Sequence, residues 1–483
     1  MKPFVEEIED LDPLQAFLSV KHLPYSLLLD SADRKHPASR YSFVVCHPIE
    51  TIESKNGKIT VTNWEQRLSF SDDDPFRILS ERMKAWREKT TTIHGLPPFQ
   101  GGAAGLFGYD LARSLEKLPS KAKDNPNIPD MSVGIYDQVY AYDHLLRKGW
   151  IITHARNESE AQTKRKFLHE RFAQEYEVPP FTAVDLEWES NFDADDYTDQ
   201  VSRVIDYINL GDIFQANISQ RLDAKIPSGF DPFIHYLHLR KVNPAPFAAY
   251  MNIGDVKISS ASPERFLVVD KNGAVQSCPI KGTRPHVGDP SIDRAYRSDL
   301  KNSEKDKAEN TMIVDLLRND LSRVCTPESV EVSALCKLES FAGVHHLVST
   351  VSGKLREDQT ALDALRACFP GGSITGAPKI RAMEIIEEIE PQRRGPYCGS
   401  IGYIGFDGTL DTSILIRTLV YDRNTVSLQV GGGVVADSDP DAEYQETFDK
   451  AAPILHSFEE DETAATEREA FETSPESVIA AAE

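Results

Sequence analysis

The sequence contains little cysteine, tryptophan and methionine, with six, four and six of these residues among 483. The six cysteines lie far apart and form no CxxC pair; they are Cys46, Cys278, Cys325, Cys336, Cys368 and Cys398. In a reducing compartment this spacing is typical of buried thiols. We therefore expect neither disulfides nor a zinc site.

Long apolar stretches are also absent. No run approaches the roughly 18 consecutive apolar residues that a membrane-spanning helix requires. The N-terminus, MKPFVEEIED, is acidic where a secretory signal is basic and then apolar. The sequence therefore predicts a cytoplasmic protein that has no membrane partner.

Basic residues are outnumbered, because 53 Lys and Arg stand against 76 Asp and Glu and give a net charge of −23. A protein that binds nucleic acid usually neutralises phosphates with a basic face, so we expect no nucleic-acid partner. The acidity is concentrated at the C-terminus, where nine acids and one base follow from Glu459 onwards. This segment has too few large apolar residues to offset its chain entropy, so residues 458–483 are predicted to be a disordered acidic tail.

The remaining chain has room for two or three domains or one composite fold, at about 150 residues per domain. Two prolines and an acidic stretch between residues 179 and 196 predict a boundary. It separates an N-terminal region, residues 1–190, from a C-terminal region, residues 191–457. Both regions contain short strand-like runs with polar alternation, which favour an α+β fold of antiparallel sheets with helices outside.

Two glycine-rich segments resemble nucleotide-binding loops. Residues 431–436 (GGGVVA) match G-x-G-x-x-A after a strand, but no second parallel strand and no ribose-binding acid follow. Residues 371–376 begin like a P-loop, but Ala377 stands where the lysine belongs, and Lys379 comes two places late. We expect neither NAD nor a nucleoside triphosphate. The second segment runs into a predicted helix and suits a carboxylate or other anion, although a plain glycine turn explains it as well.

Two predicted helices carry acids at helical spacing. The helix over residues 303–323 places Glu309 beside its apolar stripe, with Asp306 one turn earlier. A carboxylate there is costly to bury unless it is neutralised, paired or bound to a metal. The second helix opens at an Asp-Pro pair and carries Glu443 and Glu446. Each helix alone is explained by a solvated acidic face, but if the two faces meet they suit a hard cation such as Mg²⁺.

Lys281 and Glu264 are the candidates for chemistry. Lys281 precedes a Gly-Thr turn in PIKGTRP, residues 279–285, where partial burial would favour the free amine that acts as nucleophile or base. An ordinary surface lysine is the alternative. Glu264 in SPERF, residues 262–266, would act as a general acid if burial raises its pKa, and an ion pair with Arg265 is its alternative.

Adjacent histidines, His345 and His346, lie in a strand-like run. Neighbouring side chains of a strand face opposite sides. We therefore expect one histidine to point at a site and the other to be a core histidine.

Taken together, ten ordered segments of the C-terminal half closely resemble the chorismate-utilising enzymes. They are GDIFQANISQR (211–221), SPERF (262–266), PIKGTRP (279–285), KDKAENTMIVDLLRND (305–320), VHHLVST (344–350), FPGGSITGAPKIRAMEIIEEIEP (369–391), GSIGYIGF (399–406), DTSILIRT (411–418), GGGVVADSDP (431–440) and AEYQETFDK (442–450). In the N-terminal half, SLLLDSA (26–32) and GGAAGLFGYD (101–110) look like the family as well. The resemblance implies two large antiparallel sheets packed as a sandwich, with both halves contributing to the core.

Single positions distinguish the branches of this family. Gln215 stands where isochorismate and salicylate synthases carry the lysine that activates water, and Lys281 stands where anthranilate synthases usually have alanine. Asn217, Gln220 and the ITGAPK form of residues 374–379 favour the same branch. The resemblance is thus to the large subunits of aminodeoxychorismate synthases. The alternatives are an anthranilate synthase large subunit, which releases pyruvate, and a non-catalytic subunit that binds an aromatic ligand.

For this branch, the resemblance implies covalent catalysis in para-aminobenzoate and folate biosynthesis. Lys281 would attack C2 of Mg²⁺-bound chorismate while Glu264 protonates the departing C4 hydroxyl, and ammonia would then add at C4 and expel the lysine. The product is 4-amino-4-deoxychorismate. The chain has no Cys nucleophile in a glycine-rich elbow with a downstream histidine and glutamate, so ammonia is expected from a separate glutamine amidotransferase partner.

Site residues also follow from the resemblance. Glu309 and Glu446 resemble direct ligands of the Mg²⁺ cofactor, with Asp306 and Glu443 supporting them through water. The residues that resemble the chorismate site are Gly282, Thr283, His346, Tyr403, Arg417, Gly431, Gly432, Gly433 and Lys450. Among these, Arg417 has the guanidinium group that is suited to bind a carboxylate through two hydrogen bonds.

Some members of the family bind tryptophan in the N-terminal half. Residues 27–32 and 243–247 resemble that pocket, but Asp30, Ala245 and Phe247 replace its glutamate, serine and tyrosine. The sequence leaves tryptophan binding open.

Overall fold

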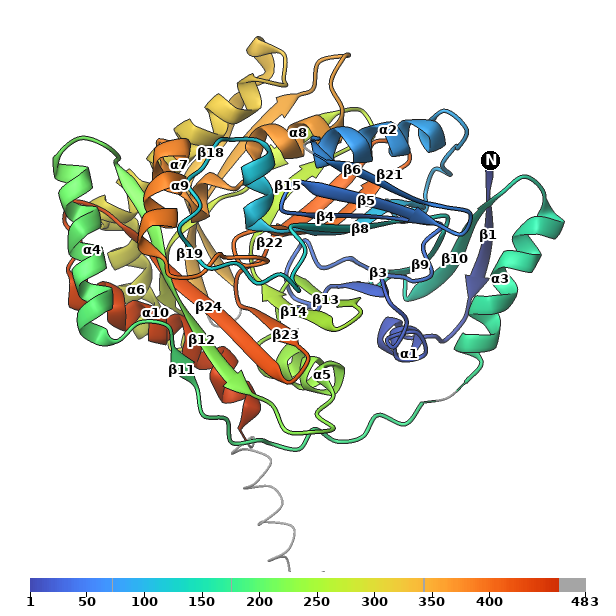
Figure 1. Cartoon of the computed structure of the whole chain (residues 1–483), viewed down its shortest axis with the longest axis horizontal. Coiled ribbons are helices and arrows are strands. Elements are labelled where there is room, and N and C mark those ends of the chain that lie inside the picture. Colours follow the sequence, from blue (N-terminus) through green and yellow to red (C-terminus); the bar gives the residue numbers. More distant parts are fainter. Residues whose placement is uncertain (72, 175, 342–343, 460–483) are drawn as a thin grey trace, which may run out of the picture.

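The computed structural model describes residues 1–71, 73–174, 176–341 and 344–459 (Figure 1). Most of the predicted acidic tail, from residue 460, lies outside the described residues. Two twelve-stranded sheets, in which every strand pairing is antiparallel, form the centre of the molecule. The predicted α+β sandwich is confirmed.

The first sheet joins strands from both halves of the chain. In spatial order they are β1 (Lys2–Ile8), β10 (Lys148–Ala155), β9 (Gln138–Asp143), β3 (Tyr41–Val45), β2 (Leu27–Asp30), β13 (Phe247–Ile253), β14 (Val256–Ser262), β23 (Thr418–Asp422), β24 (Thr425–Val434), β12 (Gln215–Lys225) and β11 (Glu189–Ser190), with β20 (Gly376–Ala377) paired to β12. The long β12–β24 pair aligns Asn217 with Gly433 and Ile218 with Gly432. This register fixes the glycine triplet in the middle of a ladder.

The second sheet is also built from both halves. Its order is β17 (Ile280–Pro285), β19 (Val344–Lys354), β16 (Ala274–Ser277), β15 (Arg265–Val269), β22 (Leu410–Ile414), β21 (Ser400–Gly405), β7 (Gly102–Phe107), β8 (Met131–Tyr136), β4 (Glu50–Lys55), β5 (Lys58–Asn63) and β6 (Arg67–Ser71), with β18 (Glu331–Phe341) paired to β19. Because strands from both sides of residue 190 share each sheet, the predicted boundary divides the sequence but not the sheets.

Ten α-helices lie around the sheets in the part of the chain that the structure describes (Figure 1). They are α1 (Pro13–Leu18), α2 (Pro75–Arg87), α3 (Glu158–Phe172), α4 (Ala194–Asn209), α5 (Pro232–Val242), α6 (Pro290–Asn302), α7 (Glu304–Ser322), α8 (Ala361–Cys368), α9 (Lys379–Ile389) and α10 (Pro440–Leu455). Short 3₁₀ helices occupy Tyr109–Ser114, Pro327–Ser329, Gly372–Ile374 and His456–Phe458. None of the described helices is long and apolar enough to cross a membrane.

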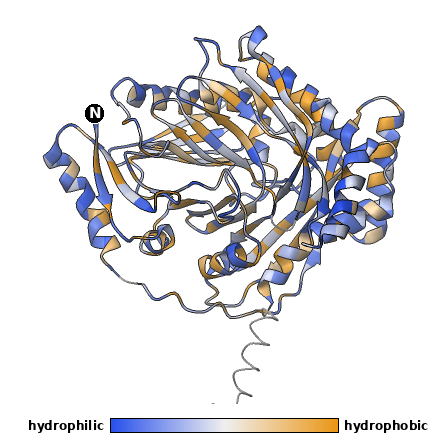
Figure 2. Ribbon diagram, turned by 180° about the vertical axis from the view of Figure 1, so that it is seen from behind, coloured by the Kyte–Doolittle hydropathy of each residue, from blue (hydrophilic) through white to orange (hydrophobic). Residues whose placement is uncertain are grey.

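Apolar side chains of both sheets meet in a shared core, which includes Phe43 and Ile152 from the first sheet and Leu106 and Ile401 from the second. A larger core packs α2, α7 and α8 against the outer face of the second sheet. Hydrophilic residues mark the outer turns of the peripheral helices (Figure 2). Burial of apolar area on both faces of the sheets is the main source of stability for such a sandwich.

Local capping explains why the two acidic helices begin where the sequence predicts. Ser303 accepts a hydrogen bond from the Asp306 amide at 3.2 Å and caps α7. Asp439 accepts from the Ala442 amide at 2.9 Å, and Pro440 occupies the first turn of α10. The sequence predicts an apolar stripe on this helix that comprises Ala308, Met312, Ile313 and Leu316. The buried face is rotated from that stripe: Ile313, Val314, Leu317 and Leu321 are buried, whereas Ala308 is exposed.

The expectation that the cysteines are buried thiols is right for four of the six. Cys46, Cys325, Cys368 and Cys398 are free and buried, whereas Cys278 and Cys336 are free and only partly buried. Between the end of β22 at Ile414 and the start of β23 at Thr418, Arg417 adopts a left-handed backbone with φ 50°. This irregularity turns Arg417 out of the ladder at the junction of β22 and β23.

Candidate functional site

The predicted site residues come from strands of both sheets and from two helices. Helix α7 packs on β17 and β19, and helix α10 packs on β24. Lys281, Gly282 and Thr283 lie in β17, and His346 lies beside them in β19. The glycine triplet in β24 faces these elements from the first sheet, so the site lies where the two sheets and the two acidic helices meet.

Lys281 lies at the centre of this group. Its Nζ is 4.0 Å from Glu309 Oε2, and both side chains are only 14% exposed. A Cβ placed on Gly433 would lie 3.3 Å from that Nζ and would collide with the side-chain amide of Gln215. Gln215 is buried, and its Oε1 has no hydrogen-bond partner among the described residues. Because Gly433 has no side chain, the side chains of Lys281 and Gln215 have room to pack against this part of the first sheet.

The acids of the two helices lie near one another, since Lys305 of α7 contacts Glu443 of α10 and Glu443 acts on the charge of Glu309. A Cβ on Gly432 would lie 2.8 Å from Glu443 Oε2 and 3.6 Å from Glu446 Oε1. Burial raises the pKa of Glu309, and nearby Glu443 adds to that effect. Burial also raises the pKa of Glu443, against a hydrogen bond from Ser438 and with a further contribution from Glu446.

Glu443 has a buried oxygen that no described residue satisfies. Its Oε1 accepts from Ser438 Oγ at 2.7 Å, whereas its Oε2 is buried and has no hydrogen-bond partner in the described chain. A buried carboxylate oxygen without a donor is costly. Converging carboxylates with a free oxygen are the donor set that a hard cation such as Mg²⁺ takes, so the residues present fit the predicted ion.

Lysines balance part of this negative charge. Lys450 Nζ lies 2.6 Å from Glu446 Oε1 and donates to the Gly431 carbonyl at 2.8 Å. Burial acts to raise the pKa of Glu446, but the combined charges of Lys450, Lys305 and Lys281 outweigh it and leave that pKa lowered. Lys305 Nζ lies 3.8 Å from Glu443 Oε1. Lys305 was not identified as a site residue from the sequence. Its position directly before Asp306 does not indicate a contact with Glu443.

Asp306 is placed differently from the other three acids. Arg284 Nη2 lies 3.3 Å from its Oδ2. Gly282, which has φ 79°, packs so close that a Cβ would lie 2.9 Å from the Asp306 carboxyl carbon. Asp306 therefore fixes the turn after Lys281 through Arg284 and Gly282. Its predicted support of a metal through water stays a prediction.

Glu264 is a buried carboxyl within electrostatic reach of Lys281. Ser373 Oγ donates to its Oε1 at 3.1 Å, and the Ile280 backbone amide also donates to the carboxylate. Burial raises its pKa to about 7, against the opposing charge of Lys281. The alternative ion pair with Arg265 is wrong, because Arg265 binds Asp411 instead, through two hydrogen bonds of 2.9 Å.

The glycine segment 371–376 contributes through Ser373, which the sequence did not identify. Lys379 donates to Asp320 at 2.6 Å and to the Cys368 carbonyl at 2.9 Å. The lysine is thus engaged in packing α9 and does not serve a phosphate loop. Within this segment, the Ser373 hydroxyl donates to the carboxyl of Glu264. The role of the segment as a direct binder of a substrate anion stays a prediction.

His346 and Arg417 form the other side of the group. Thr283 Oγ1 and His346 Nδ1 lie at hydrogen-bond distance, 2.9 Å. Burial and the neighbouring Arg417 lower the pKa of His346 to about 4, so the imidazole is neutral near pH 7. Burial lowers the pKa of Arg417, and no carboxylate among the described residues pairs with it. A shielded guanidinium without an acid is suited to bind a carboxylate from outside.

Tyr403 is the predicted residue that the structure places elsewhere. It lies in β21, where its ring stacks on Phe99 with centroids 4.5 Å apart and meets Phe43 at 5.5 Å. Tyr403 and Phe43 line a cavity of about 720 Å³, which Asp30 and Phe247 also line. The two segments that resemble a tryptophan pocket therefore meet at this cavity, apart from the Lys281 group.

Comparison with known proteins gives one family and close relatives. The family described as chorismate binding enzyme matches residues 25–456. Aminodeoxychorismate synthase component 1 of Escherichia coli is 44% identical over 443 residues, which cover 92% of this chain and 95% of that protein. Anthranilate synthase component 1 of Thermus thermophilus is 39% identical over 95% of this chain and 97% of its own length. Among solved structures, anthranilate synthase component I of Streptococcus pneumoniae matches with a TM-score of 0.78 at 33% identity and covers 87% of this chain and 93% of its own.

Proposed function

Because this chain belongs to the family of chorismate binding enzymes, we propose that it converts chorismate and ammonia into 4-amino-4-deoxychorismate and water. The observation that carries the proposal is the position of Lys281. Its amine lies against Gly433 and 4.0 Å from Glu309, beside the buried carboxyl of Glu264. Nucleophile, acid and anion-binding groups thus lie within one shielded group of residues.

The first step uses Lys281 and Glu264 together. The lone pair of the Lys281 amine attacks C2 of chorismate, the two conjugated ring double bonds shift, and the C–O bond at C4 breaks. Glu264, whose pKa of about 7 leaves it partly protonated near neutral pH, donates its proton to the leaving hydroxyl, which departs as water. The lysine nitrogen is then bonded to C2 of the ring.

In the second step ammonia attacks C4, the two conjugated double bonds shift back, and the bond between C2 and the Lys281 nitrogen breaks. The free lysine is regenerated, and the proton lost by the added ammonia restores Glu264. The two displacements replace one difficult substitution at C4, which is the general advantage of covalent catalysis.

Binding groups hold the substrate in this position. Arg417 binds one carboxylate of chorismate, and Thr283 with neutral His346 lines the ring side of the site. Glu309 and Glu446, supported by Glu443, would hold Mg²⁺, which supplies positive charge for a substrate carboxylate. Lys450 orients Glu446 and the Gly431 carbonyl.

The product assay tests this proposal directly. The purified chain is incubated with chorismate, Mg²⁺ and ammonium, and products are separated by chromatography. We expect 4-amino-4-deoxychorismate without release of pyruvate. Fluorescent anthranilate with equimolar pyruvate would instead establish the anthranilate synthase reaction that the name of the Thermus relative describes. Unchanged chorismate would favour a non-catalytic subunit, provided that ammonia and Mg²⁺ are saturating.

We also propose that a glutamine amidotransferase supplies the ammonia. The relatives are named as component 1, which supports a second component. Glutamine alone should give no product with this chain and should replace ammonium once an amidotransferase partner is added. Product from glutamine without any partner would contradict the proposal.

A further inference from the structure

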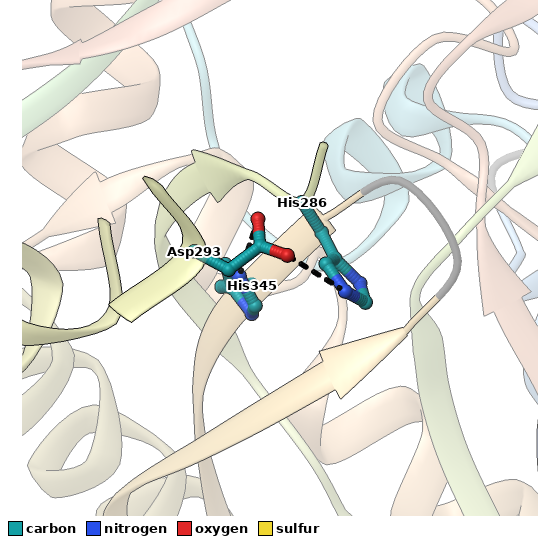
Figure 3. A group of neighbouring side chains, drawn as sticks. All are labelled: His286, Asp293 and His345. Carbon is teal, nitrogen blue, oxygen red and sulfur yellow. Dashed lines mark ion pairs between the residues drawn. The ribbon is translucent and has the colours of Figure 1, made fainter. Parts of the chain in front are cut away.

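A second group of potential metal ligands lies on the face of β19 opposite His346. It consists of His286, just after β17, Asp293 in the first turn of α6, and His345 in β19. The Asp293 carboxylate lies beside the two imidazoles, whose ring centroids are 4.6 Å apart (Figure 3). One ligand atom from each residue lies within 4.8 Å of the other two.

The separations match those of ligands around one small ion. His286 Nε2 is 3.3 Å from Asp293 Oδ2, and His345 Nε2 is 3.7 Å from Asp293 Oδ1. Two ligand atoms at tetrahedral positions around Zn²⁺, each roughly 2.0–2.1 Å from the ion, lie about 3.4 Å apart. At 3.7 Å the His345 contact is too long for a hydrogen bond.

His345 points into this group with an unsatisfied nitrogen. Its side chain is 2% exposed, and its Nδ1 lies 2.7 Å from Ser340 Oγ. The other ring nitrogen, Nε2, is buried and has no hydrogen-bond partner in the described chain. A buried nitrogen of this kind needs a ligand.

The carboxylate is held in place from behind. The backbone amides of Val287 and Gly288 donate to Asp293 Oδ1 and Oδ2 at 2.8 and 3.0 Å. These bonds fix the carboxylate beside the two ring nitrogens and leave further lone pairs on both oxygens. Support of a ligating carboxylate by such bonds is typical of metal sites.

We propose that His286, Asp293 and His345 bind a divalent ion of the Zn²⁺, Co²⁺ or Ni²⁺ class. Two imidazoles and one carboxylate suit these borderline ions, whereas Mg²⁺ selects oxygen ligands. The site is therefore distinct from the carboxylate group around Glu309 and Glu446. The expectation that the chain holds no zinc rested on its cysteines, which take no part here.

The fourth position of the ion faces an open cavity of about 420 Å³. Arg294 and Arg297 line it and are exposed. Their charges oppose a bare cation but favour an anion or hydroxide at its open position. The bound ion joins the end of β17, the start of α6 and β19. Because β17 carries Lys281, occupancy is expected to stabilise the strand on which that lysine lies.

The test uses the full chain without an affinity tag and Co²⁺ as the probe, in the presence of excess Mg²⁺. We expect visible Co²⁺ absorption bands that saturate at one equivalent and disappear when Zn²⁺ is added. His286→Ala removes the most exposed ligand, whose side chain is 34% exposed, so it should fold. It should weaken Co²⁺ binding by about 100-fold or more, since even loss of a supporting partner costs roughly 10–100-fold.

Matched variants separate this site from others. His169→Ala is the control, because His169 forms a pair with Glu6 at 3.2 Å and belongs to no group of three potential ligands that the structure describes. It should bind Co²⁺ like the parent chain, as should the Glu309→Gln, Glu446→Gln double variant. The proposal is overturned if no stoichiometric band forms, if His286→Ala titrates like the parent, or if the double variant abolishes the band. It does not rest on the proposed function.

Discussion

At the scale of single residues, Lys281 separates the proposed reaction from its alternatives. Replacing it by alanine removes the atom that bonds to C2. We expect Lys281→Ala to lose any trapped adduct with the substrate and to make aminodeoxychorismate at least about 100-fold more slowly. Mass spectrometry of the quenched enzyme detects the adduct, and chromatography measures the rate.

A matched control is Lys271→Ala, which removes an exposed lysine from the turn between β15 and β16. It should keep both adduct and rate. If Lys281→Ala made product at the parent rate, the lysine would have no covalent role.

Glu264 couples catalysis to stability. In the unfolded chain its carboxyl has the ordinary pKa of 4.5, whereas burial raises the folded pKa to about 7. The folded state thus holds the proton more tightly, and stability is lost as pH rises from about 4.5 through 7. Glutamine resembles the protonated form at every pH. We therefore compare the free energy of unfolding of Glu264→Gln with that of the parent. The difference in favour of the variant should be about 2–3 kcal/mol larger at pH 8 than at pH 5.

Urea unfolding at the two pH values measures this difference. The same variant should lose activity by roughly 10²–10⁴-fold, because a general acid is removed. The parent should lose activity as pH rises above about 7, as Glu264 gives up its proton. A stability difference that is equal at both pH values would contradict the raised pKa.

At the scale of elements, the two acidic helices could be predicted from local signals. Ser303 and the Asp-Pro pair at 439–440 mark helix starts in the sequence itself, and α7 and α10 begin there. The contact of Ser373 with Glu264 joins residues 109 positions apart. Such contacts depend on how the sheets pack, and no local pattern encodes them. The same holds for His286, Asp293 and His345, and for the place of Tyr403 in a separate cavity.

The meeting of α7 and α10 predicts a shared ion. Glu309→Gln removes a carboxylate from one helix and leaves the others on α10. The concentration of Mg²⁺ that gives half-maximal activity should rise at least about tenfold. Glu304→Gln is the control, because Glu304 lies in the first turn of α7 with a side chain that is 93% exposed. An equal Mg²⁺ requirement for both variants would place the ion elsewhere.

At the scale of the whole molecule, the sheets make the two halves of the sequence interdependent. Strand β2 pairs with β13, aligning Leu29 with Ala249, and β7 pairs with β21, aligning Ala104 with Tyr403. Both pairs cross the predicted boundary at residue 190. Separation of the halves would expose long sheet edges and the apolar faces that meet between the sheets.

The whole chain should therefore unfold as one cooperative unit. In calorimetry we expect a single transition whose calorimetric and van't Hoff enthalpies agree. The fragment of residues 191–459 should aggregate when expressed alone, because β13 and β21 each lose a partner strand, and co-expression with residues 1–190 should recover soluble protein. Two separate transitions, or a fragment that folds alone with native circular dichroism, would show that each half has a sufficient core and that the paired strands add little to it.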